Sequence, residues 1–193
     1  MKCLFLGYNR SETKLVSFLK KKGYSVKQTK KNISQEASNY DLIISFGYRK
    51  VIKKNVLNSL KRPIINLHMS YLPYNRGSHP NFWSFYKNTP KGVSIHEINE
   101  LLDGGPIIFK KKINFKIVKN KRFTFKQAYK KSFIELEKLF IDNFEKIRMK
   151  KYKTKKNLIN SGSIHRVKDL PNEIRHFDVN IYSFLKKKSK SIK

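Results

Sequence analysis

Residues 63–77 read PIINLHMSYLPYNRG, an apolar run that becomes polar at Asn66 and His68. The apolar start predicts a buried strand, and residues i and i+2 of a strand point to the same face. The amide and the imidazole are therefore expected to face one site. A Leu-Pro and an Arg-Gly follow at once, as is typical of a loop that leaves a strand end. The alternative is a strand that ends in a polar loop without a catalytic role.

Strands and helices are predicted to alternate around this stretch. Strands are expected over residues 2–8, 24–29, 41–47, 63–68, 92–98 and 105–115, and helices over residues 11–23, 50–60 and 80–88. Ser11 is the expected N-cap of the first helix. The alternation predicts an α/β fold with a Rossmann-like open, mostly parallel sheet and helices on both faces. Ligands of such sheets bind at the carboxyl ends of the strands, which places residues 45–49 and 66–70 at the ligand edge.

The C-terminal part is expected to contain one long helix and a basic tail. Apolar residues recur at helical spacing over residues 124–149, and the polar stretch that follows is expected to be irregular. We expect one catalytic domain at residues 1–150. Residues 151–193 are expected to form a basic extension that packs on this domain or trails from it.

Composition favours a globular protein of the cytoplasm. Hydrophobic residues make up 39% of the 193 residues, and no apolar run approaches the roughly 18 residues that span a bilayer. The N-terminal apolar stretch is too short for a signal peptide. Cys3 is the single cysteine, so no internal disulfide is expected, which fits a reducing compartment.

The formal net charge of +31 is the most extreme feature of the composition. The lysines are spread along the chain, so we expect solvated basic faces and no specific nucleic-acid partner. A positive field also attracts small anionic substrates. A basic RNA-binding module is the alternative from a different class of protein.

Asp103, in the stretch ELLDGGPII of residues 100–108, is the best candidate to orient the imidazole. An Asn/His/Asp set suits acyl transfer to an amine. The amide donates to the developing oxyanion, and the imidazole donates to that oxygen or handles the amine proton. His79, His96 and His165 fit no metal spacing, so structural or exposed roles and no metal are expected.

Residues 65–85, INLHMSYLPYNRGSHPNFWSF, and residues 92–108, GVSIHEINELLDGGPII, resemble the folate-dependent formyltransferase family. That family includes methionyl-tRNA, glycinamide ribonucleotide and nucleotide-sugar formyltransferases. The resemblance implies a formyltransferase fold that uses 10-formyltetrahydrofolate, with Asn66, His68 and Asp103 as the catalytic triad.

The same resemblance implies further site residues. Cofactor contacts are expected from Phe46, Gly47, Tyr48, Leu72 and Gly104, and substrate contacts from Ser70, Arg76 and Gly77. Ordinary core packing is the alternative for Phe46 and Leu72. Arg76 either steadies its loop or faces an anionic ligand.

The acceptor amine is the remaining choice. The first strand is followed by LGYNRSETK, which lacks the Gly-Ser-Asn phosphate loop of the glycinamide ribonucleotide enzymes. The stretches SYLPYNRGSHPNFWSF and HRVKDLP look more like sugar-nucleotide formyltransferases. A nucleotide-linked amino sugar is therefore the expected acceptor. Glycinamide ribonucleotide, and a basic RNA-binding protein on an inactive scaffold, are the alternatives, and a homodimer is left open.

Overall fold

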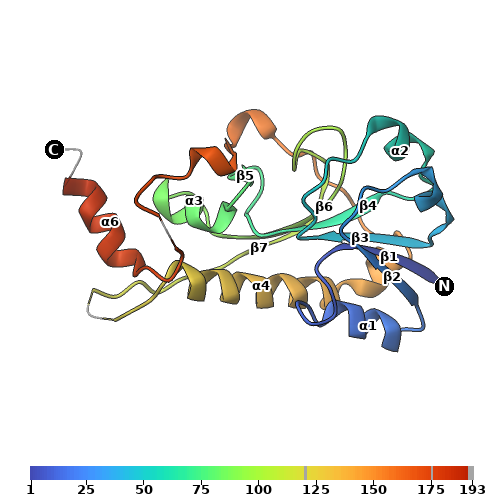
Figure 1. The fold of residues 1–193 in the computed structure, drawn as a ribbon, viewed down its shortest axis with the longest axis horizontal. Coiled ribbons are helices and arrows are strands. Elements are labelled where there is room, and N and C mark those ends of the chain that lie inside the picture. Colours follow the sequence, from blue (N-terminus) through green and yellow to red (C-terminus); the bar gives the residue numbers. More distant parts are fainter. Residues whose placement is uncertain (120, 175, 191–193) are drawn as a thin grey trace.

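A six-stranded sheet organises the fold in this computed structural model, which describes residues 1–119, 121–174 and 176–190. The strand order is β2-β1-β3-β4-β6-β7 (Figure 1). The strands are β1 (Lys2–Gly7), β2 (Ser25–Thr29), β3 (Leu42–Phe46), β4 (Ile64–His68), β6 (Gly92–Glu97) and β7 (Ile107–Lys112). The first four run parallel, whereas β6 is antiparallel to both β4 and β7. The predicted mostly parallel sheet is confirmed.

Helices lie on both faces of this sheet. They are α1 (Leu15–Lys21), α2 (Lys54–Ser59), α3 (Pro80–Tyr86), α4 (Phe125–Asp142), α5 (Phe144–Arg148) and α6 (Ile181–Lys190). Short 3-10 turns are η1 (Gln35–Asn39), η2 (Ile159–Ser161) and η3 (Val167–Asp169), and β5 (Arg76–Gly77) pairs with β8 (Ile164–His165) in a separate two-stranded sheet. Helices α1 and α4 cover one face, and α2 lies on the other (Figure 1).

The central strands are apolar on both faces because both faces are covered. In β1, Cys3 and Phe5 belong to the cluster that packs against α1 and α4. Leu4 and Leu6 belong to a second cluster, with residues of η1 and α2. This two-sided burial holds the carboxyl ends of β1, β3 and β4 at one edge.

The predicted helix over residues 124–149 is two helices. A capping box starts α4: Gln127 donates its backbone N–H to Thr124 Oγ1 at 3.2 Å, and Thr124 donates its N–H to Gln127 Oε1 at 2.9 Å. The break falls at Asn143, whose φ of −111° and ψ of 10° are not helical. Its side-chain amide donates to the Leu139 carbonyl at 2.9 Å. A single helix was therefore wrong at this residue.

Residues 150–171 contain only the short elements η2, β8 and η3, but the expectation of an irregular C-terminal tail was wrong for residues 181–190. Residues Ile181–Lys190 form α6, whose Ile181 is fully buried. Phe184 and Leu185 pack against the aromatic cluster that contains Phe82 and Phe125. The sequence of this helix contains few apolar residues among many lysines, so its periodicity did not predict a helix. Its stability depends on packing against that cluster, which the sequence alone does not show.

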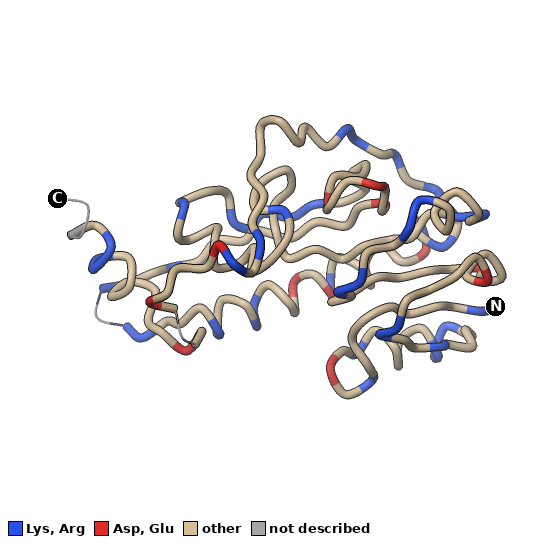
Figure 2. The backbone as a smooth tube through the Cα atoms, turned by 45° about the horizontal axis from the view of Figure 1, so that its top comes forward, with Lys and Arg blue, Asp and Glu red and all other residues tan. Residues whose placement is uncertain are grey.

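Basic residues follow the whole trace rather than one element (Figure 2). Among the described residues, no helix is both long enough and apolar enough to cross a membrane. Within the same residues, no group of three or more His, Cys, Asp or Glu side chains could hold a metal ion.

Candidate active site

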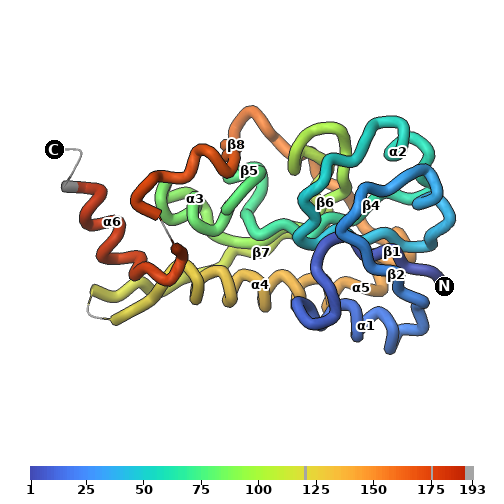
Figure 3. Tube along the Cα trace, viewed as in Figure 1, coloured from blue at the N-terminus to red at the C-terminus, as the bar shows by residue number. Residues whose placement is uncertain are grey.

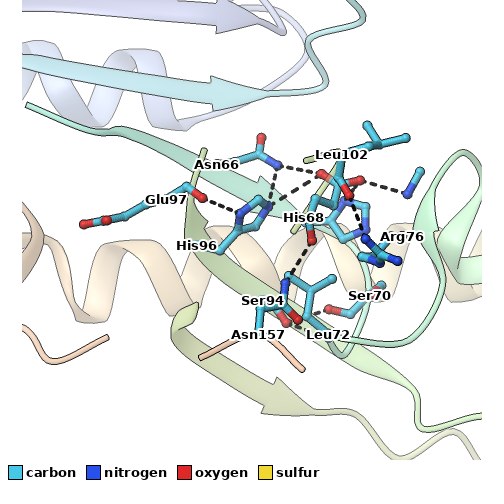
Figure 4. Close-up of polar contacts among 12 residues, drawn as sticks. Asn66, His68, Ser70, Leu72, Arg76, Ser94, His96, Glu97, Leu102 and Asn157 are labelled. Atoms are coloured by element: carbon cyan, nitrogen blue, oxygen red, sulfur yellow. Dashed lines mark hydrogen bonds and ion pairs between the residues drawn. The ribbon is translucent and has the colours of Figure 1, made fainter. Parts of the chain in front are cut away.

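Asn66 and His68 lie at the carboxyl end of β4, as their spacing predicts. His68 is 8% exposed, and its Nδ1 lies 3.6 Å from Asp103 Oδ2. Asn66 Nδ2 lies 3.3 Å from the other carboxylate oxygen, Oδ1. The structure thus brings together the three residues that the sequence singled out. Figure 4 shows Asn66 and His68 at this strand end.

A tight turn presents the Asp103 carboxylate to β4. Asp103 has a φ of +45°, in the left-handed region that few residues other than glycine adopt. The backbone N–H of Gly77 donates to Asp103 Oδ2 at 2.8 Å. The carboxylate therefore has an amide neighbour, a backbone donor and two imidazole neighbours, since His96 Nε2 lies 3.6 Å from Asp103 Oδ1.

His96 is the site residue that the sequence reasoning missed. Strand β6 pairs with β4 so that His96 is opposite Asn66, and His96 Nε2 lies 2.9 Å from Asn66 Nδ2. His96 Nδ1 lies 2.8 Å from the Glu97 carbonyl, which only accepts, so Nδ1 carries the proton. In the neutral ring Nε2 then accepts from Asn66. Alternation within GVSIHEI could have placed His96 at the site only if the pairing of β6 with β4 were known.

The orientation of the Asn66 amide follows from its neighbours. Asp103 Oδ1 accepts only, so the nitrogen of the amide faces it. One N–H of Asn66 bonds to His96, and the other makes the longer contact with Asp103. That longer contact is the weaker one.

Burial and neighbouring charges determine the protonation states of His68 and Asp103. Burial lowers the pKa of His68, and the attraction of Asp103 offsets only part of this effect. Burial tends to raise the pKa of the Asp103 carboxyl, but His68, His96 and the Gly77 N–H outweigh it and lower that pKa below its usual range. Both directions give a carboxylate beside a neutral imidazole at neutral pH.

His68 Nε2 is buried and has no hydrogen-bond partner among the described residues. Its Nδ1 faces the carboxylate, so the proton of the neutral ring lies on Nδ1. Nε2 is then an unpaired acceptor. Buried polar atoms are rarely left without a partner, so this nitrogen is suited to receive a proton from a ligand.

The predicted cofactor residues divide into two groups. Phe46 is 1% exposed and packs against Tyr8, with the ring centroids 4.9 Å apart, and Leu72 is fully buried. Both side chains are core residues. Gly47 is exposed, has a φ of +71°, and with half-buried Tyr48 follows the end of β3. Gly104 follows Asp103 and is buried.

The predicted substrate residues lie in the loop after β4. The Ser70 hydroxyl is buried and donates to the Tyr74 carbonyl, so it serves the loop itself. Arg76 Nη1 donates to the Leu102 carbonyl at 3.4 Å, while its Nε has no partner among the described residues. Gly77 has a φ of +85°, and a Cβ there would collide with the His165 carbonyl, so only glycine fits.

Comparison with known proteins shows which family the chain resembles in sequence and in structure. The formyl transferase family profile matches residues 3–136. The chain is 33% identical to the formyltransferase PseJ from Anoxybacillus kamchatkensis, with a TM-score of 0.85 over 97% of this chain and 99% of that one. That crystal structure is a complex with UDP-4,6-dideoxy-4-formamido-L-AltNAc and tetrahydrofolate.

Curated relatives are more distant or shorter matches. The dTDP-4-amino-4,6-dideoxyglucose formyltransferase of Mycobacterium tuberculosis is 28% identical over 77% of this chain and 60% of its own length. Methionyl-tRNA formyltransferase of Finegoldia magna is 36% identical over 44% of this chain and 30% of its own length. The chain thus spans less than two thirds of these relatives. The family profile nevertheless matches well over half of the chain. The chain belongs to the formyl transferase family.

Proposed function

We propose that this protein transfers a formyl group from 10-formyltetrahydrofolate to the primary amine of a nucleotide-linked amino sugar. The observation that carries the proposal is the buried Nε2 of His68, for which the described part of the chain provides no hydrogen-bond partner. This nitrogen belongs to an imidazole whose other nitrogen faces Asp103, and Asn66 lies beside the same carboxylate. An acceptor for an amine proton and a donor for a carbonyl oxygen thus stand at one strand end.

Asn66 is the donor in this scheme. Its N–H makes a long contact of 3.3 Å with Asp103 Oδ1, and a short displacement would redirect it to the formyl oxygen. Negative charge grows on that oxygen as the amine attacks, so a donor fixed nearby lowers the barrier. His96 holds the second N–H and thereby fixes the plane of the amide.

His68 handles the proton. The attacking amine becomes acidic as its nitrogen bonds to the formyl carbon, and Nε2 accepts the proton that is lost. Asp103 stabilises the imidazolium that forms. The proton then passes to the folate nitrogen as its bond to the formyl carbon breaks, which returns His68 to the neutral state.

The residues at the ends of β3 and β4 fit a folate beside this pair. 10-Formyltetrahydrofolate supplies the formyl carbon when bound. The exposed backbone of Gly47 directly follows β3, the parallel neighbour of β4, and a Cβ at Gly47 would collide with the Tyr8 ring. Phe46 pairs with Leu67, so Gly47 and Tyr48 offer backbone groups at the end of the sheet where His68 lies. The buried ring of Phe46 packs against Tyr8 beside them.

The choice of acceptor rests on the likeness to PseJ, whose crystal structure contains a UDP-linked formamido sugar. The likeness extends over nearly the whole of both chains, which supports a similar acceptor here. The strongly basic composition favours a substrate that contains a diphosphate.

A panel of acceptors tests the proposal. The protein would be incubated with 10-formyltetrahydrofolate and either UDP- or dTDP-linked amino sugars or glycinamide ribonucleotide, with mass spectrometry to detect formyl gain. We expect one of the amino-sugar nucleotides to be formylated fastest. Faster formylation of glycinamide ribonucleotide would contradict the proposed acceptor, and formylation of none would contradict the proposed activity.

A further inference from the structure

Residues 155–165, which we name the C-terminal strap, return from α5 to the candidate active site. Figure 3 shows the chain leaving α5 beside the sheet and running back over the molecule to β8, next to β5. Ile107 and Lys155 exchange two backbone hydrogen bonds, each 2.8 Å long. At the other end, Arg76 donates its N–H to the Ser163 carbonyl at 2.8 Å. The strap therefore joins the start of β7 to the loop after β4.

Asn157 is the strap residue that contacts the catalytic turn. Its side chain is buried, with the residue 6% exposed, and Nδ2 donates to the backbone carbonyl of Asp103 at 3.0 Å (Figure 4). Asp103 has a left-handed backbone conformation, which is uncommon for a residue with a side chain. The hydrogen bond from Asn157 is a specific constraint on that peptide.

The strap also acts on the donor to the Asp103 carboxylate. Gly77 donates to Asp103 Oδ2, and Gly77 is paired with His165 through β5 and β8. Asn75, fully buried in the same loop, donates its N–H to Ser163 Oγ at 3.0 Å. The backbone of Asp103 and the loop that binds its carboxylate are thus both tied to one segment.

We propose that Asn157 is a positioning residue, which holds the Asp103 carboxylate in place against His68 through its hydrogen bond to the Asp103 carbonyl. Its effect on turnover rests on the proposed formyl transfer, whereas its effect on the site geometry does not. Without the Asn157 donor the turn is free to leave its left-handed conformation, and the distance from the carboxylate to the imidazole grows. Asn157 itself touches no reacting atom in this account.

The test compares Asn157→Ala with Ser161→Ala. Ser161 is an exposed residue of the strap whose hydroxyl donates to the Leu158 carbonyl at 2.8 Å, within its own turn. For each protein, thermal melting, kcat and KM for formyl transfer, and the NMR titration of the His68 ring would be measured. The groups that act on the His68 titration are Asp103, His96 and the backbone of Asn75, and the attraction of Asp103 is the larger of the two influences that raise the midpoint.

We expect Asn157→Ala to lower kcat at least about tenfold, the scale of a misplaced acid–base group, with a smaller change in KM. The titration midpoint of His68 should fall, because the attraction of Asp103 that raises it is weakened. Ser161→Ala should match the wild type in all three measurements. Asn157→Leu, which has a similar shape but lacks the donor and adds no charge near His68, should behave like Asn157→Ala, and it replaces that variant if Asn157→Ala does not fold.

A variant that melts at a lower temperature but keeps the wild-type kcat and the wild-type His68 midpoint would overturn the inference, because Asn157 would then be only structural. If the wild-type protein transfers no formyl group, the proposed function fails. The His68 midpoint still decides the positioning role in that case: an unchanged midpoint in the Asn157 variant overturns it, and a lowered one supports it.

Discussion

At the level of single residues, the site depends on an imidazole that stays neutral beside a carboxylate that stays ionised. His68 has the lowered pKa of a buried base, while the donors around Asp103 keep it ionised. Asn66 contacts His96 with one N–H and Asp103 with the other. The side chains of Asn66, His68 and Asp103 are therefore restrained before any ligand binds, which reduces the free-energy cost of ordering them during the reaction.

Replacement of His68 or Asp103 should remove most of the turnover. We expect His68→Asn and Asp103→Asn each to lower single-turnover formylation by about a hundredfold or more, the scale of a positioned acid–base group. Asparagine is chosen because it keeps a polar side chain at each position. Alanine at these two buried sites would also affect folding. Near-normal turnover in either folded variant would contradict the catalytic assignment.

The titration of His68 gives a second prediction at this scale. Because burial lowers the pKa of His68, its NMR titration midpoint should lie below the ordinary value of about 6.5. The neutral base should therefore persist as the pH falls below 6.5, and turnover assigned to it should be lost only at the lower midpoint. A midpoint above 6.5 would show that the attraction of Asp103 exceeds the effect of burial.

At the scale of elements, helix α1 is held by a residue far away in the sequence. Its N-cap Lys14 makes no side-chain cap, and the expected cap, Ser11, instead donates to Asn9 Oδ1 at 2.6 Å. Glu137 of α4, 4% exposed, accepts from Thr13 Oγ1 at 2.6 Å and from the Lys14 N–H at 3.0 Å. One carboxylate thus connects the start of α1 to the middle of α4.

Loss of this contact should destabilise the fold. We expect Glu137→Ala to lower the free energy of unfolding by about 1–3 kcal/mol, because the buried hydroxyl of Thr13 and the partly buried N–H of Lys14 lose their acceptor. Glu135→Ala is the matched control on the same helix, since its ion pair with Lys111 is partly exposed and worth about 0–1 kcal/mol. Equal losses in the two variants, measured by urea unfolding, would argue against the long-range cap.

The elements differ in how far the sequence alone could predict them. Strands β1, β3 and β4 were predictable because two-sided burial makes them mostly apolar, and Asn66 and His68 follow from the i and i+2 rule. His96 and Asn157 were not, since each reaches the site through contacts between distant segments. The separation of α4 from α5 depends on the conformation of Asn143, which periodicity does not show.

At the scale of the whole molecule, the charge and the fold serve different roles. Lys and Arg total 44 against 13 Asp and Glu, and they are spread along the trace rather than gathered in one element (Figure 2). The site itself is assembled from β4, β6, the turn at Asp103 and the C-terminal strap. The chemistry therefore depends on a few buried contacts, while the surface charge provides a general attraction for anions.

Nucleic acid should accordingly bind only weakly. We expect single-stranded and duplex nucleic acid to bind without sequence preference, and the affinity to fall steeply as salt approaches about 0.15 M, since such binding rests on counterion release. Fluorescence anisotropy across a salt series measures this dependence. A tight, sequence-selective complex at physiological salt would favour the RNA-binding alternative.

The stoichiometry of a single turnover distinguishes formyl transfer to an amine from hydrolysis of the formyl group. Excess protein would be mixed with 10-formyltetrahydrofolate and a UDP-linked amino sugar, and the formamido sugar, tetrahydrofolate and free formate would be quantified together. We predict equal amounts of formamido sugar and tetrahydrofolate, with no free formate, because His68 and Asn66 act on an amine that attacks the formyl carbon. Release of tetrahydrofolate with free formate and no formamido sugar would contradict transfer to this amine.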